Sequence, residues 1–143
     1  MLAYILYILI IMRKMPGSTN AVLILEDDQD LADSIRLFLE DVYPVYTIND
    51  PSKLNSYISK YGIKLLVTDL DMSNPNLKID LQSIKSSNPG VKIILMYMFL
   101  DEEGLKDHAI LKDADDYIFK PFDADVFRYK IDRLLAEVQN ANI

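Results

Sequence analysis

The sequence of 143 residues has no cysteine and no tryptophan, and it has a single histidine, His108. Without cysteine the chain can form no disulfide, no thiolate metal site and no cysteine nucleophile. His108 has no second base or nucleophile near it in the sequence, so we interpret it as a surface residue. Basic residues are also outnumbered, with 15 Lys and Arg against 22 Asp and Glu, a formal net charge of −7 and a pI near 4.6. Because phosphate backbones are bound by clustered Lys and Arg, this balance predicts no nucleic-acid partner. It favours a cation or a basic partner instead.

The one long hydrophobic run lies at the N-terminus, where residues 1–12 read MLAYILYILIIM and Arg13-Lys14 follow. A helix that spans a membrane needs about 20 apolar residues, whereas this run covers only about 18 Å. A secretory signal would carry its positive charge before the run and end at a small-residue cleavage site, and this run has neither feature. We therefore predict that the chain is not exported and lies in the cytoplasm. Two interpretations stay open. Met12 or Met15 is the natural start, or the run makes a weak contact with a membrane or a partner, with the rest of the chain in the cytoplasm.

The turn-forming residues Pro16-Gly17-Ser18-Thr19-Asn20 separate this run from the remainder. We therefore predict that residues 1–19 form an N-terminal extension with a turn-rich linker and that residues 20–143 form one domain. A chain of this length is long enough to bury one core and too short for two ordinary domains.

Strand-like and helical patterns alternate along that domain. Continuous apolar runs, typical of strands buried on both faces of a parallel sheet, occur at 21–25, 63–68, 91–96 and 116–119, with a weaker run at 45–48. Helical spacing follows each of them: Leu31–Leu39 after a cap at Asp28 or Asp30; Leu54, Tyr57 and Ile58 after Pro51; Leu77, Leu81 and Ile84; about 101–111; and, after a cap at Asp123, Val126, Phe127, Lys130, Ile131, Leu134 and Leu135. Five strand–helix units predict a parallel α/β sheet with helices on both faces.

Ligands of such a sheet bind beyond the carboxyl ends of its strands. The predicted strands end in Glu26-Asp27-Asp28, Asp69-Leu70-Asp71, Tyr97-Met98 and Lys120-Pro121. Carboxylates about 4 Å apart repel by roughly 4 kcal/mol at an effective dielectric constant of 20, so a cation is expected among them. All-oxygen ligands suit Mg²⁺. A metal and Lys120 around the Asp69 carboxylate would stabilise the charge of a phosphoryl group in transfer.

Three segments in this order resemble the receiver domains of response regulators in two-component signalling. They are residues 22–28, 65–72 and 114–122, and the resemblance extends from Ala21 to the end of the last helix. It implies a flavodoxin-like doubly wound sheet of five parallel strands, in the order 2-1-3-4-5, with five helices.

The same resemblance implies the roles of the residues at the strand ends. Glu26 and Asp27 match the acidic pair that holds Mg²⁺, and Asp69 matches the phosphoacceptor. The backbone carbonyl of Asp71 matches the third protein ligand of the metal, and Lys120 matches the lysine that contacts the phosphoryl group.

Two aromatic residues complete the implied site. Tyr117 matches the aromatic that turns inward on activation. Tyr97 stands where the family has Thr or Ser, with its hydroxyl further out, and Met98 is bulky where the family has a small residue. The family's Pro after the acceptor is displaced to Pro75, so we predict a longer or differently turned loop from Met72 to Asn76.

The resemblance predicts a single-domain response regulator that is not an enzyme beyond self-phosphorylation and self-dephosphorylation. A phosphohistidine donor, either a sensor histidine kinase or a histidine phosphotransfer protein, would phosphorylate Asp69, and the signal would pass to a downstream protein target by contact. One alternative is a pseudo-receiver that docks partners without phosphorylation, which Tyr97 and Met98 favour. A second is a phosphatase of the haloacid-dehalogenase type, because Asp69-Leu70-Asp71 resembles its Asp-x-Asp signature. In that family, however, the signature ends the first strand and a large further portion supplies more acids.

Overall fold

A five-stranded parallel sheet forms the centre of the computed structural model, which describes residues 1–13, 20–69, 80–98 and 112–141. The strand order is β2-β1-β3-β4-β5, and all neighbouring strands pair in parallel. This confirms the doubly wound, flavodoxin-like fold that the sequence predicts. The strands are β1 (Ala21–Leu25), β2 (Val45–Ile48), β3 (Ile63–Asp69), β4 (Lys92–Met98) and β5 (Asp116–Lys120).

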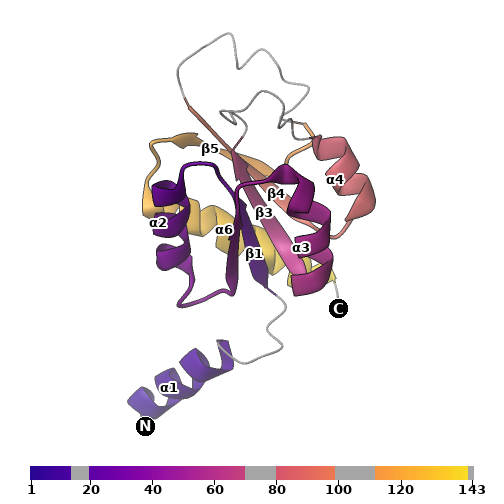
Figure 1. The fold of residues 1–143 in the computed structure, drawn as a ribbon. Coiled ribbons are helices and arrows are strands. Elements are labelled where there is room, and N and C mark those ends of the chain that lie inside the picture. The colour runs from indigo at the N-terminus through magenta and orange to yellow at the C-terminus, as the bar shows by residue number, and fades with distance from the viewer. Residues whose placement is uncertain (14–19, 70–79, 99–111, 142–143) are drawn as a thin grey trace.

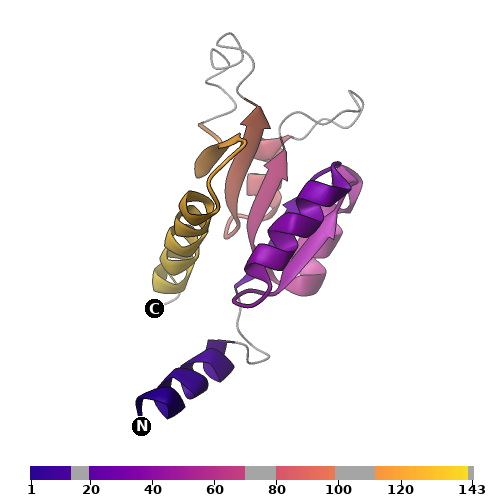
Figure 2. The same ribbon diagram turned by 90° about the vertical axis from the view of Figure 1, so that its left-hand side faces the viewer.

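Helices cover both faces of the sheet (Figures 1 and 2). On one face lie α2 (Gln29–Leu39) and α6 (Ala124–Ala141), whose apolar side chains share one core cluster with Val22 and Ile24. On the other face lie α3 (Leu54–Tyr61), which follows the short helix η1 (Pro51–Lys53), and α4 (Leu81–Ser87). The helix expected at about 101–111 falls outside the described residues.

Burial on both faces explains why the strands appear as unbroken apolar runs. All five residues of β1 are buried, with Leu23 and Leu25 toward α3 and α4, and Val22 and Ile24 toward α2 and α6. A strand that faces water on one side would instead alternate apolar and polar residues. The edge strand β2 is only partly buried, which is why its pattern is weaker.

Acidic side chains cap most of the helices, and the sequence predicts this at Asp28 and Asp123. The carboxylate of Asp28 accepts a hydrogen bond from the Leu31 amide, that of Asp50 from Ser52, and that of Asp123 from Asp125 and Val126. Asp80 does the same for α4, which begins at Leu81, while Leu77 lies outside the described residues. Gly62 ends α3 at φ 61°, a left-handed conformation that favours glycine.

The predicted buried face of α6 is wrong at one residue, Val126. Phe127, Ile131, Leu134 and Leu135 are buried as expected, but Val126 is 49% exposed. Successive helical residues point about 100° apart, so a stripe centred on Phe127 and Ile131 turns Val126 toward solvent.

The apolar N-terminal run forms a helix, α1 (Leu2–Arg13), that lies apart from the sheet in Figure 1. Its large apolar side chains, from Leu2 to Ile10, are 38–77% exposed. Within the described ranges, no helix is long and apolar enough to cross a membrane.

Candidate functional site

Three strands bring their carboxyl ends together at the upper edge of the sheet in Figure 1. Glu26 follows β1, Asp69 ends β3, and Lys120 ends β5, opposite Met98 of β4. The long side chain of Lys120 reaches across β4, and its Nζ lies 2.6 Å from Asp69 Oδ2 and 2.7 Å from Glu26 Oε2. Both carboxylates are buried. One ammonium group therefore holds two buried acids from two different strands.

Burial and hydrogen bonding determine the charges of Glu26 and Lys120. Burial raises the pKa of Glu26, although Lys120 and the Asp28 amide, which donates to Glu26 Oε1 at 3.0 Å, oppose that effect. For Lys120, burial lowers the pKa, but the hydrogen bonds to Asp69 and Glu26 outweigh burial, and the pKa is raised overall. Lys120 is consequently charged at neutral pH, and its charge stabilises the ionised form of Glu26.

The side chain of Asp27 completes an acidic cluster with Glu26 and Asp69, because one carboxylate oxygen of each lies within 4.8 Å of the others. Oxygens around Mg²⁺ lie about 2.0–2.1 Å from the ion, hence about 3–4 Å from one another. Donor type, charge and spacing therefore fit a magnesium ion, with one acid bound directly or through water. Asp71, whose carbonyl was predicted as a further ligand, and the loop from Met72 to Asn76 lie outside the described residues.

The aromatic residues of β4 and β5 lie on the face covered by α3 and α4. Tyr97 is only 8% exposed, and its ring centroid is 4.5 Å from that of Phe119 and 6.0 Å from that of Tyr117. Burial raises the pKa of Tyr97, and its hydroxyl has no hydrogen-bond partner among the described residues. Tyr117 is 43% exposed. The sequence indicated Tyr97 and Tyr117 but did not show that the ring of Phe119, also on β5, contacts both of them.

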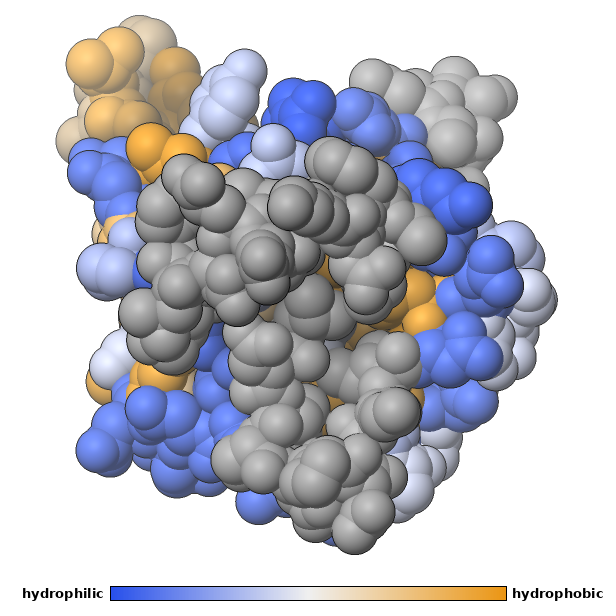
Figure 3. All heavy atoms as spheres, turned by 90° about the horizontal axis from the view of Figure 1, so that it is seen from above, coloured by the Kyte–Doolittle hydropathy of each residue, from blue (hydrophilic) through white to orange (hydrophobic). Residues whose placement is uncertain are grey.

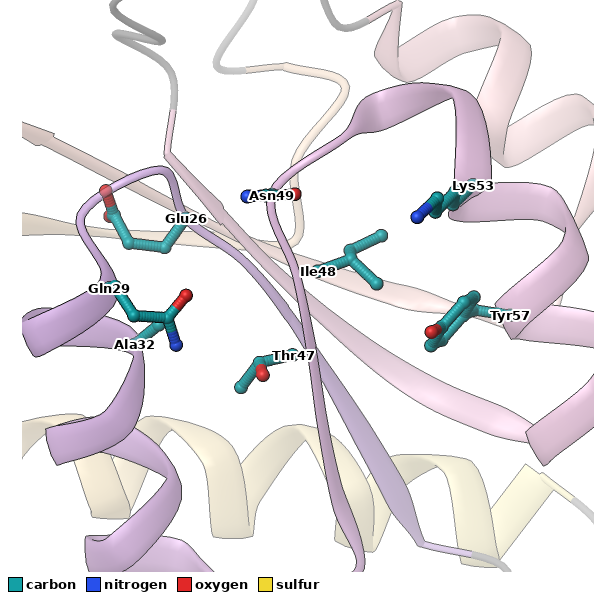
Figure 4. A pocket seen from close by; sticks show the side chains of 8 residues that line it. All are labelled: Glu26, Gln29, Ala32, Thr47, Ile48, Asn49, Lys53 and Tyr57. Carbon is teal, nitrogen blue, oxygen red and sulfur yellow. The ribbon is translucent and has the colours of Figure 1, made fainter.

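A small pocket beside Glu26 was not predicted. Its volume is about 150 Å³, and Figure 4 shows side chains from α2, the end of β2, η1 and α3 around it. No motif indicated it, because four separate segments supply its lining. The lining residues are Glu26, Gln29, Ala32, Thr47, Ile48, Asn49, Lys53 and Tyr57.

Figure 3 views the molecule from the carboxyl edge of the sheet. Most of the described surface in this view is hydrophilic.

The doubly wound sheet and the acids at its carboxyl edge define a flavodoxin-like α/β domain with an acidic cluster at that edge. The protein-family model of the response regulator receiver domain matches residues 22–132, and the chain belongs to this family. Receiver domains are signalling modules of two-component systems.

Curated relatives include the transcriptional regulatory protein CrdR of Helicobacter pylori, which is 30% identical over 113 residues. The match covers 78% of this chain and 53% of CrdR. The aerobic respiration control protein ArcA of Escherichia coli K12 is 25% identical over 126 residues, covering 85% of this chain and 51% of ArcA. The chain thus spans about half the length of these curated relatives.

Solved structures show the same fold. A receiver domain protein from Clostridium thermocellum superposes with a TM-score of 0.73 at 21% identity, covering 85% of this chain and 98% of that one. The signal receiver domain of a LuxO repressor protein from Vibrio parahaemolyticus gives a TM-score of 0.71 at 20% identity, covering 86% and 95%.

Proposed function

We propose that this receiver domain accepts a phosphoryl group on Asp69 from a phosphohistidine donor, in a reaction that requires Mg²⁺. The observation that carries the proposal is the convergence of Asp69 with Glu26, Asp27 and Lys120 at the carboxyl edge of the sheet. The donor would be a sensor histidine kinase or a histidine phosphotransfer protein, and the signal would reach a downstream protein by contact.

Each residue has a defined part in this proposal. Asp27, Asp69, water held by Glu26 and the carbonyl of Asp71 would bind the ion, which would supply charge stabilisation to the phosphoryl oxygens. An Asp69 oxygen forms the new P–O bond while the P–N bond of the donor breaks and the imidazole nitrogen keeps the electron pair. Lys120 donates a hydrogen bond to Asp69 Oδ2, so it is close enough to donate one to an oxygen of a phosphoryl group attached to Asp69.

Metal binding and phosphorylation can be tested separately. Titration should show Mg²⁺ binding in the millimolar to sub-millimolar range, and Asp27→Ala should abolish it. A native protein without any Mg²⁺ response, or an Asp27→Ala variant with unchanged affinity, would show that the acidic cluster is not a metal site.

For phosphorylation, the intact mass after incubation with acetyl phosphate and Mg²⁺ should increase by one phosphoryl group. Asp69→Asn should gain nothing, and omission of Mg²⁺ should prevent the gain. A modified Asp69→Asn protein would place the acceptor elsewhere.

A second candidate function, docking without phosphorylation, is favoured by the packing of Tyr97. Its ring is buried against Phe119 and Tyr117, at the position where the family has a small hydroxyl side chain. The two candidates differ in the mass experiment, because a docking module that ignores phosphate would stay unmodified under the same conditions.

A further inference from the structure

Some of the described basic side chains of this acidic chain form salt bridges, and others do not. Most of the described Lys and Arg side chains form salt bridges, but Lys53, Lys60, Lys64 and Lys112 form none within the described part of the chain. Three of these four lie in residues 51–68, a segment without any Asp or Glu. The paired residues are Arg36, Lys85, Lys92, Lys120, Arg128, Lys130 and Arg133.

Lys53, the last residue of η1, and Lys60 of α3 alternate with tyrosines along one side of these two consecutive helices. Lys53, Tyr57 and Lys60 are four and then three residues apart, so they share a side about 10 Å long. The ring centroids of Tyr57 and Tyr61 are 5.2 Å apart, and Lys60 Nζ lies 5.1 Å from the Tyr61 ring. Tyr46 of β2 stacks on Tyr61 with centroids 4.1 Å apart. We call these five side chains the α3 stripe.

The pocket beside Glu26 lies at the upper end of the α3 stripe. Figure 4 shows Lys53 directing its amine toward the end of β2, where Asn49 and Thr47 add neutral polar groups. The carboxylate of Glu26 also lines this pocket and belongs to the acidic cluster with Asp27 and Asp69, so the pocket itself does not favour a further carboxylate. The exposed lysines of the α3 stripe are the part of this face that would attract one.

We propose that the α3 stripe forms a docking surface for an acidic segment of a partner protein. One carboxylate of the partner would pair with Lys53 and a second with Lys60, and apolar atoms between them would pack on the tyrosines. Charge complementarity selects this occupant. Lys53 and Lys60 form no salt bridge within the described residues, whereas most of the other described Lys and Arg side chains are paired with an acid of this chain. A phosphate backbone, by contrast, would meet the net charge of −7 along its whole length. The surface is separate from Asp69 and requires no phosphorylation.

The test uses the full chain and two synthetic peptides of equal length, one rich in Glu with a single central Phe, and the other with every Glu replaced by Gln. Titration followed by amide spectra should shift signals of α3 and β2 with the Glu peptide only, and added salt should weaken the binding. The double variant Lys53→Gln with Lys60→Gln should bind about three- to tenfold more weakly, as expected for the loss of two exposed ion pairs. Lys112→Gln removes the same kind of unpaired charge elsewhere and should bind like the native protein.

Four outcomes would overturn the proposal. The Glu peptide could fail to bind at millimolar concentration, it could shift amides elsewhere while leaving those of η1, α3 and β2 unchanged, or Lys112→Gln could weaken its binding as much as the double variant does. Tighter binding of an oligothymidine to α3 than of the Glu peptide would also overturn it, because the occupant would then be a nucleic acid.

Discussion

At the scale of single residues, Tyr97 carries a polar group into the core without a described partner. A buried hydroxyl that has lost water and gained no hydrogen bond costs about 1–3 kcal/mol. The adjacent rings of Phe119 and Tyr117 offer apolar contact, which a phenylalanine would keep.

Tyr97→Phe should therefore raise the free energy of unfolding by about 1 kcal/mol, measured by urea denaturation. Tyr43→Phe is the matched control, because the Tyr43 hydroxyl donates to Asp132, and its removal should lower stability by about 1 kcal/mol. A loss of stability in Tyr97→Phe equal to that in the control would show that the Tyr97 hydroxyl is bonded.

Asp116 joins β5 to α6 through Lys130 at 2.9 Å and Arg133 at 2.7 Å. Burial raises its pKa, but the hydrogen bonds from Lys130 and the Tyr117 amide outweigh burial, and the pKa lies below its ordinary value of 3.8. Since the folded pKa is depressed, this carboxylate stabilises the fold above about pH 4 and loses that effect as pH falls through the folded pKa.

Asp116→Asn should accordingly lower stability by about 1–2 kcal/mol at pH 7, with the difference from the native protein shrinking below pH 4. Urea denaturation at a series of pH values measures this. A difference that stays constant from pH 7 to pH 3 would mean that the Asp116 side chain matters through packing and not through charge.

At the scale of whole elements, the sequence predicts strands better than the extent of helices. Continuous apolar runs identify β1, β3 and β4 because both faces of these strands are buried, and acidic caps locate the starts of α2 and α6. The error at Val126 arises because an apolar residue beside a buried stripe looks the same in sequence whether it faces in or out. The pocket beside Glu26 could not be predicted, because its residues meet only after β2 and α3 pack together.

The helix α1 should be dispensable for folding, as its exposed apolar side chains contribute little to the core. A chain beginning at Pro16 should unfold in urea with the same midpoint and the same dependence on denaturant as the full chain. We propose residues 20–143 as the folding unit on this basis. Loss of solubility or cooperativity after the truncation would assign α1 to the core or to an assembly.

At the scale of the whole molecule, phosphorylation can change conformation only through its different interactions with the two states. In the family, the fourth-strand hydroxyl moves toward the phosphoryl group and the fifth-strand aromatic follows it. Here the buried ring of Tyr97 contacts both Phe119 and Tyr117, so inward movement of Tyr117 would meet a filled space.

We therefore expect weak switching, with the phosphorylated state favoured less by one hydrogen bond to a charged group, about 1.5–3 kcal/mol. A beryllofluoride mimic should shift amide signals strongly near Asp69 and only weakly along β4 and β5. Shifts across β4 as large as those at Asp69 would contradict weak switching. They would not contradict the proposal that Asp69 is the phosphoacceptor.

The double ion pair of Lys120 has a consequence for how the protein experiences its ionic surroundings. Three carboxylates against one ammonium leave two negative charges, which a single divalent cation balances and a monovalent one does not. Because the ammonium already links the ends of β1, β3 and β5, the fold has an internal tie that does not depend on the supply of metal. Chelation should then prevent the proposed phosphorylation while leaving the fold intact, so the proposed role of Mg²⁺ is in the reaction and not in holding the strands together.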